Sequence, residues 1–152
     1  MSAGVKYRAH SPAHAVMNEL RILVVDDDRL MLTLLVGVLR REGYAKVDRA
    51  TGGKEAIAKF LQTRPDIVFM DIEMPEINGI ETLKAIKEFG IVTQVVIVTA
   101  SPTTQNVAAA QENGASGFLV KPVSPAKVTK AIEACQAKAK QEAGSVELFI
   151  CE

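Results

Sequence analysis

The chain of 152 residues lacks most of the signals that would place it in a specialised class. Its two cysteines, Cys135 and Cys151, do not have the spacing of a metal or redox motif, so we interpret them as free thiols in a reducing compartment. No apolar stretch approaches the ~18 residues of a membrane-spanning helix. No apolar core of a signal peptide follows Lys6 and Arg8. We therefore expect a cytoplasmic protein.

Neither sign of charge is in excess, because 18 basic residues balance 18 acidic ones. The chain also has no dense block of lysine and arginine, so bulk charge predicts no nucleic-acid partner, and the lack of an apolar span predicts no membrane partner. Hydrophobic residues make up 48% of the chain, which is ordinary for a globular protein. The length is sufficient for one domain with a substantial core.

Short β-branched runs alternate with helix-like segments from about residue 20 to residue 137. Strands are expected over 21–26, 45–49, 66–70, 93–99 and 117–120, and helices over 29–41, 54–62, 80–89, 104–113 and from 125 onward. Strands that alternate with helices favour parallel pairing through right-handed crossovers. The pattern therefore predicts an α/β protein, with helices on both faces of a parallel sheet.

The first expected helix has apolar residues at helical spacing. Leu30, Leu34 and Val38 recur at every fourth position, with Leu35 beside them, and we interpret these residues as the buried face. Asp28 directly precedes this helix, where its side chain can accept a hydrogen bond from a free backbone amide. We therefore predict that Asp28 is the N-cap of the helix.

The two ends of the chain do not fit the repeating pattern. We interpret residues 1–19 as a polar N-terminal arm and residues 138–152 as a C-terminal tail. The tail continues the last helix, which Gly144 is expected to end, and then alternates apolar residues at 146, 148 and 150. This last part is either a strand added to a sheet edge or a segment that contacts a partner chain.

Polar residues stand where four of the expected strands end. Asp26 and Asp27 follow the first strand, Asp71 the third, Thr99 closes the fourth, and Lys121 follows the fifth. Because the carboxyl ends of parallel strands lie along one edge of the sheet, where open α/β sheets bind ligands, we expect these side chains to converge. Any one of them alone would be interpreted as a cap or turn residue, but five at one edge indicate a site.

Three carboxylates in one cleft repel one another unless a cation lies between them. A ligand set made only of oxygen atoms favours Mg²⁺, with Mn²⁺ as an alternative. Asp27 and Asp71 are candidates for direct ligands, and Asp26 for a ligand that acts partly through water. A backbone carbonyl near Glu73 completes the expected set.

The same residues are suited to phosphoryl chemistry. A carboxylate forms acyl phosphates when nearby cations neutralise the incoming charge, so one of the three aspartates is a candidate nucleophile. Lys121 supplies a second positive charge, and Thr99 supplies a hydroxyl donor for a phosphoryl oxygen.

These motifs resemble the receiver domain of response regulators in two-component signalling. The matching stretches are 22–28, 68–75, 79–80, 96–100 and 114–122, and the likeness covers about residues 20–137. Both the order and the spacing of the stretches agree with the family. The resemblance implies a flavodoxin-like fold, a three-layer sandwich of five helices and a five-stranded parallel sheet of order 2-1-3-4-5.

The resemblance also implies a role for each site residue. Asp71 is the expected phosphoacceptor, Asp26 and Asp27 the acidic pair that binds Mg²⁺, Glu73 a ligand through its backbone carbonyl, Thr99 the switch hydroxyl, Lys121 the partner of the phosphoryl group, and Phe118 the switch aromatic. It further implies a cis bond between Lys121 and Pro122. The phosphoryl donor would be a sensor histidine kinase or a histidine phosphotransfer protein.

By the same resemblance, the signal would leave through the helix at 104–113, the strand at 117–120 and the next helix, toward an unknown downstream protein. The domain would be a signalling module, not an enzyme, which catalyses only its own phosphorylation and dephosphorylation. The tail is too short for a DNA-binding motif, so output is expected through a partner. A homodimer, a phosphorylation-independent module with a vestigial acidic site, and an aspartate-based phosphatase are left open as alternatives.

Overall fold

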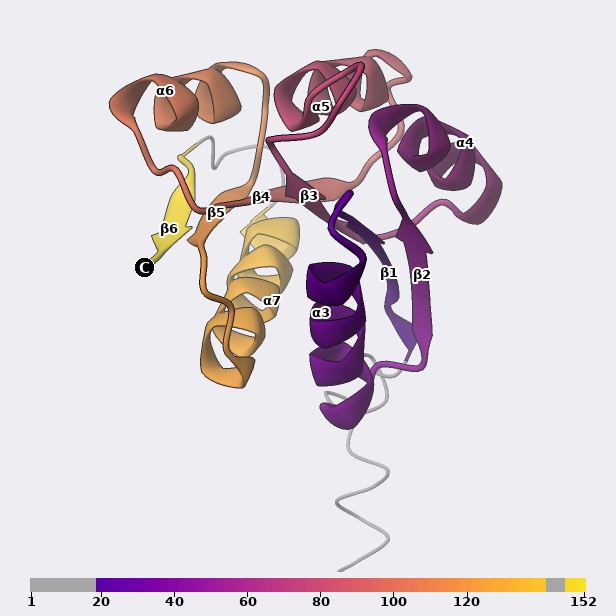
Figure 1. The fold of residues 1–152 in the computed structure, drawn as a ribbon. Helices are drawn as coiled ribbons and strands as arrows, with labels where there is room; N and C mark the ends of the chain where they lie inside the picture. The colour runs from indigo at the N-terminus through magenta and orange to yellow at the C-terminus, as the bar shows by residue number, and fades with distance from the viewer. Residues whose placement is uncertain (1–18, 142–146) are drawn as a thin grey trace, which may run out of the picture.

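The computed structural model describes residues 19–141 and 147–152. Of the N-terminal arm expected over 1–19, only Glu19 is described, and the helix end expected at Gly144 also lies outside these ranges. The described chain folds into three layers, with one sheet between two groups of helices (Figure 1). None of its helices has the length and apolar character that a membrane crossing needs.

The sheet contains six parallel strands in the order β2-β1-β3-β4-β5-β6. Their bounds are Arg21–Val25 for β1, Lys46–Ala50 for β2, Ile67–Asp71 for β3, Gln94–Thr99 for β4, Gly117–Val120 for β5 and Phe149–Cys151 for β6. The predicted fold and the order 2-1-3-4-5 are confirmed, but five strands was one too few. The C-terminal residues supply the sixth strand, at the outer edge of β5.

In the part of the chain that the structure describes, five helices cover the two faces of the sheet. They are α3 (Arg29–Arg41), α4 (Gly53–Thr63), α5 (Gly79–Glu88), α6 (Thr104–Glu112) and α7 (Pro125–Gln141). Figure 1 shows α3 and α7 on one face and α4, α5 and α6 on the other. Two apolar clusters, one on each face, form the core.

The central strands are apolar on both sides because both sides are covered. In β3, Ile67 and Phe69 belong to the cluster under α3 and α7, whereas Val68 and Met70 belong to the cluster under the other helices. Successive side chains of a strand point to opposite faces, so a strand covered on both faces is a continuous apolar run. Such a run ends where the chain leaves the core, which places its first polar residue at the sheet edge.

The buried face of α3 is not the predicted one. Leu30 is 68% exposed and Leu34 is 50% exposed, whereas Leu35 is buried and Val38 only partly so. The residues that are buried are Leu32, Leu35, Val36 and Leu39. These four residues also recur at helical spacing, so α3 has two overlapping apolar rows, and its contacts with β1, β2 and α7 decide which row is buried.

The predicted cap of α3 is confirmed. The Asp28 carboxylate accepts hydrogen bonds from the backbone amides of Leu30, at 3.0 Å, and Met31, at 3.4 Å. The cap begins the helix immediately after β1. It thereby fixes the short turn that holds Asp26 and Asp27 at the carboxyl end of that strand.

Candidate functional site

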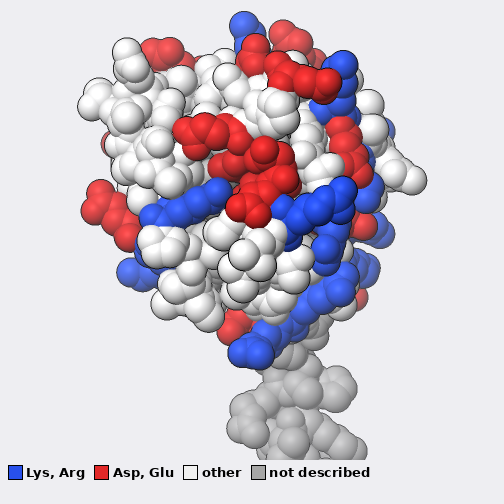
Figure 2. Space-filling model, in the orientation of Figure 1, with Lys and Arg blue, Asp and Glu red and all other residues white. Residues whose placement is uncertain are grey.

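The structure brings all five predicted polar residues to one edge of the sheet. Asp26 and Asp27 directly follow β1, Asp71 and Thr99 are the last residues of β3 and β4, and Lys121 directly follows β5. Figure 2 shows acidic side chains gathered at the centre of one face, with basic side chains on both sides of them. The site therefore lies at the surface, over the carboxyl ends of the central strands.

The three aspartates form a compact cluster. One carboxylate oxygen from each of Asp26, Asp27 and Asp71 lies within 4.8 Å of the other two. Asp26 and Asp71 are buried, with 6% and 4% of their surface exposed, and Asp27 is exposed. Two carboxylates thus form the base of the cluster, and the third faces solvent.

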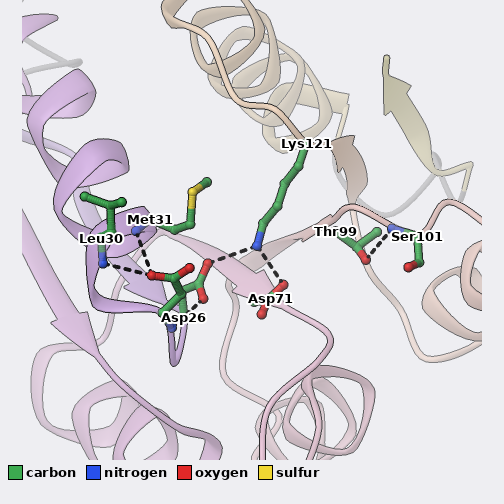
Figure 3. A network of polar contacts seen from close by, with 8 residues as sticks. Asp26, Leu30, Met31, Asp71, Thr99, Ser101 and Lys121 are labelled. Atoms are coloured by element: carbon green, nitrogen blue, oxygen red, sulfur yellow. Dashed lines mark hydrogen bonds and ion pairs between the residues drawn. The ribbon is translucent and has the colours of Figure 1, made fainter.

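Lys121 joins the two buried carboxylates. Its Nζ lies 3.2 Å from Asp26 Oδ2 and 3.3 Å from Asp71 Oδ1, and Figure 3 shows it between the two side chains. Burial alone would lower the pKa of Lys121, but the carboxylates of Asp71 and Asp26 outweigh it and raise that pKa. The side chain is therefore held as a cation. The bond from Lys121 to Pro122 is cis, as predicted.

Asp71 is the member of the cluster whose ionisation is most unfavourable. Burial and the neighbouring charge of Asp26 raise the pKa of Asp71 to about 6, with a smaller contribution from Glu73, although Lys121 acts in the opposite direction. Asp71 Oδ1 is buried and has no hydrogen-bond partner among the described residues, because Lys121 faces it only as an ion pair. One ammonium does not compensate two buried carboxylates.

These features fit a divalent cation. An acceptor-only cluster with an unsatisfied buried oxygen, Asp71 Oδ1, needs additional positive charge. The donors are all oxygen atoms, which favour magnesium or manganese over zinc. Asp27, the exposed member, leaves the cluster open to solvent, as a cation that keeps part of its water shell requires.

Thr99 lies beside this cluster and connects it to α6. Its hydroxyl oxygen accepts a hydrogen bond from the Ser101 amide at 3.0 Å, and Asn106 of α6 donates to the Ser101 carbonyl at 2.9 Å. In Figure 3 the Thr99 side chain points toward Ser101. Among the described residues, no hydrogen bond joins the Thr99 hydroxyl to the carboxylates. The predicted switch aromatic, Phe118 of β5, is fully buried.

The last residue of the predicted set, Glu73, lies just after β3. Glu73, whose backbone carbonyl was the expected ligand, follows β3 by two residues and has an exposed side chain. Two contributions were missed in the sequence. The backbone amide of Asp28 donates to Asp26 Oδ1 at 2.9 Å and so orients that carboxylate. A Cβ on Gly79 would lie 2.0 Å from the Asp71 carbonyl oxygen, so only glycine allows the chain to pass behind Asp71.

The signals for these two contributions were present but ambiguous. A third aspartate after β1 is fully explained by its role as a helix cap, although its backbone amide also faces the site. A glycine at the start of a helix has many explanations, and its close approach to β3 depends on the path of the loop between them.

Fold and site together define a doubly wound α/β protein with a cluster of three aspartates and a lysine paired with two of them. The model of the response regulator receiver domain matches residues 22–133. Chemotaxis protein CheY of Thermotoga maritima is 38% identical over 112 residues, which cover 74% of this chain and 93% of that protein. Transcriptional regulatory protein ResD of Bacillus subtilis is 39% identical over 124 residues, which cover 82% of this chain and 51% of that protein.

Solved structures agree. A chain of the CheX–CheY–BeF3–Mg²⁺ complex from Borrelia burgdorferi is similar with a TM-score of 0.74 and 33% identity, over 78% of this chain and 90% of that one. A CheY-like receiver domain protein from Methanospirillum hungatei gives a TM-score of 0.75 and 28% identity, over 80% of this chain and 98% of that one. The chain belongs to the response regulator receiver domain family. It is a signalling domain of the two-component type.

Proposed function

We propose that the chain is a phosphoacceptor response regulator, which accepts a phosphoryl group on Asp71 from a phosphohistidine. The observation that carries the proposal is the geometry of one group of atoms. Three carboxylate oxygens lie within 4.8 Å of one another, and Lys121 Nζ lies 3.2 Å from Asp26 and 3.3 Å from Asp71. An incoming phosphoryl group needs positive charge beside the acceptor carboxylate, which Lys121 supplies on one side and a cation held by the carboxylate cluster would supply on the other.

In the proposed transfer, an oxygen of the Asp71 carboxylate forms a bond to phosphorus while the bond between phosphorus and the donor imidazole nitrogen breaks. The electron pair of that bond stays on the imidazole nitrogen. Lys121 neutralises charge on the phosphoryl oxygens, and the Thr99 hydroxyl donates to one of them. Water later attacks the phosphorus, which releases inorganic phosphate and restores the carboxylate.

The metal ligands in this proposal are the carboxylates of Asp26, Asp27 and Asp71 and the backbone carbonyl of Glu73. The three carboxylate oxygens within 4.8 Å support this choice. Bound Mg²⁺, or Mn²⁺ in its place, supplies positive charge that compensates both the clustered carboxylates and the phosphoryl oxygens.

We further propose that the surface formed by α6, β5 and α7 carries the signal to a downstream protein. In the structure the Thr99 hydroxyl oxygen accepts a hydrogen bond from the Ser101 amide at 3.0 Å. This hydrogen bond breaks when Thr99 turns toward the phosphoryl group. The loop that Asn106 ties to α6 is then free to shift, and the ring of Phe118, which is already buried, moves further inward into the space that Thr99 leaves. A local change of charge thereby selects between two arrangements of the surface.

A protein donor would dock beside the site on the exposed leucines of α3. Leu30 is 68% exposed and Leu34 is 50% exposed, and α3 begins just after the acidic turn. We expect Leu34→Ser to slow transfer from an autophosphorylated histidine kinase and to leave labelling by acetyl phosphate unchanged. Equal slowing with both donors would exclude this docking surface.

The experiment that tests the function compares acetyl phosphate and BeF₃⁻ with and without Mg²⁺. The wild-type chain should gain a phosphoryl group that hydroxylamine removes, seen in the intact mass, and should show bound fluoride by fluorine NMR. Both signals should require Mg²⁺ and vanish in Asp71→Asn. Asp48→Asn, which removes a partly buried carboxylate on β2, is the matched control and should behave as wild type.

The absence of modification under every condition would favour the alternative, an interaction module with a vestigial site. Turnover of small phosphate esters would favour a phosphatase instead.

We also propose the division into an arm (1–19), a receiver domain (20–137) and a tail (138–152), and a location in the cytoplasm. The free state of Cys135 and Cys151 supports a reducing compartment. A measurement of molecular mass in solution tests whether the chain forms homodimers.

A further inference from the structure

The outer edge of β5 is covered by the C-terminal segment of the chain itself. β6 pairs with β5 in parallel register, with Gly117 opposite Phe149, Phe118 opposite Ile150 and Leu119 opposite Cys151. Figure 1 shows β6 beside β5 at the end of the sheet. An edge strand presents unpaired backbone groups that another strand can bind, and here residues 149–151 bind them.

Contacts from three elements hold this segment in place. The Leu148 amide donates to Gln111 Oε1 of α6 at 3.1 Å, the Phe149 amide donates to the Ser116 carbonyl before β5 at 3.1 Å, and the Lys138 ammonium of α7 donates to the Glu147 carbonyl. Lys138 Nζ also lies 5.8 Å from the centre of the Phe149 ring. The segment therefore contacts α6, β5 and α7, the three elements of the proposed output surface.

The aromatic ring of Phe149 packs against Gly117. A Cβ on Gly117 would lie 2.2 Å from the ring atoms Cε1 and Cζ of Phe149, so the ring packs directly against the glycine backbone. Gly117 is not among the residues with positive φ, so its backbone does not require glycine. The close approach of the Phe149 ring is therefore what excludes a side chain at this position.

The segment also packs near the predicted switch residue. Leu148 contacts the apolar cluster that contains Phe118, whereas Phe149 and Cys151 contact the cluster on the other face of the sheet. Ile150, opposite Phe118 in the register, points to the same side as Leu148. With the segment docked, Phe118 has no exposed surface. A docked segment and a buried Phe118 ring therefore occur together in the arrangement that the structure shows.

We propose that residues 147–152 are an intramolecular ligand of the α6–β5–α7 surface, and that their docking and phosphorylation of Asp71 favour each other through Phe118 and Thr99. The inference rests on the proposed function, in which phosphorylation draws Phe118 into the space that Thr99 leaves. Docking closes the sheet edge beside the ring, and phosphorylation opens space for the ring at Thr99, so both favour the inward position of Phe118 and each stabilises the other. A target that adds a strand to β5 must first displace residues 147–152.

The two cysteines allow docking to be measured in the intact chain. Cys151 lies in β6 and is partly buried, so it should react with iodoacetamide mainly when the segment leaves β5. Burial raises the pKa of the Cys151 thiol in the docked state, which slows the reaction further. Cys135 is 1% exposed and reports only unfolding of the domain. Peptide mass spectrometry then measures the two alkylation rates separately.

With Mg²⁺ and BeF₃⁻ present, alkylation of Cys151 should slow by about fivefold or more, and that of Cys135 should stay slow. Gly117→Ala and Phe149→Ala should both speed alkylation of Cys151 and weaken the binding of BeF₃⁻. Phe149→Ala truncates a side chain at the sheet edge, so it tests docking without a change in β5. Gly37→Ala is the matched control, because a Cβ there meets nothing within 4 Å.

The outcomes separate this inference from the proposed function. If fluorine NMR shows Mg²⁺-dependent binding of BeF₃⁻ and the Cys151 rate does not change, the coupling is wrong and the function stands. If BeF₃⁻ does not bind at all, the function fails and the coupling fails with it. If Gly117→Ala and Phe149→Ala both leave the Cys151 rate at the wild-type value, residues 147–152 are not docked on β5 as proposed.

Discussion

Replacing Asp71 by asparagine should make the metal-free protein more stable at neutral pH. The pKa of Asp71 is raised from 3.8 to about 6, mainly by burial and then by the charge of Asp26. Each pKa unit corresponds to about 1.4 kcal/mol, so ionised Asp71 lowers the free energy of unfolding by about 3 kcal/mol. Asparagine removes this charge but also the ion pair with Lys121, so we expect a net gain of about 1–3 kcal/mol.

The pH dependence has a definite sign. Between about pH 4 and pH 6 the folded protein keeps a proton on Asp71 that the unfolded chain has already lost. The folded state therefore binds more protons, and the stability of the wild type falls as the pH rises through this window. The fall is complete above the folded pKa of about 6. Asp71→Asn should remove this part of the pH dependence.

The assay is urea unfolding followed by circular dichroism, in EDTA, at several pH values across this window. Asp48→Asn controls for the loss of one negative charge elsewhere on the sheet. A variant at Asp71 that is no more stable at neutral pH, or that keeps the wild-type slope with pH, would refute the reasoning. It would mean that Asp71 ionises at little cost, and that the cluster does not need a cation.

Three further predictions follow from the same contacts. Added Mg²⁺ should raise the free energy of unfolding of the wild type with increasing concentration and should stabilise Asp71→Asn much less; equal stabilisation would place the ion elsewhere. In EDTA, Lys121→Met should lower the free energy of unfolding by about 2–4 kcal/mol, because Asp26 and Asp71 then face each other without their shared cation. Mg²⁺ should restore part of this loss, and a loss below about 0.5 kcal/mol in EDTA would contradict the prediction. Leu35→Ala should lower the free energy of unfolding in urea by about 2–5 kcal/mol, and Leu34→Ala by less than about 1 kcal/mol. The reverse order would mean that α3 buries the face predicted from its periodicity.

Much of this protein is encoded locally and is readable from the sequence. A strand buried on both faces must be a short apolar run, and its first polar residue must lie at the edge of the sheet, so the sequence alone predicts the positions of Asp71 and Lys121. The position of Asp28 before an apolar helix was sufficient to predict a cap. The order of the strands came from the likeness to a family, since the local pattern shows only that they alternate with helices.

Tertiary structure decided the features that depend on neighbours distant in the chain. The buried side of α3 follows from its packing on β1, β2 and α7, because the helix has two overlapping apolar rows and spacing alone does not choose between them. The pKa of Asp71 depends on how deeply the carboxylate lies and on the distance to Asp26, neither of which spacing encodes. The alternation near residue 150 left two positions open, and the bare backbone of Gly117, which admits the ring of Phe149, made the edge of β5 the one adopted.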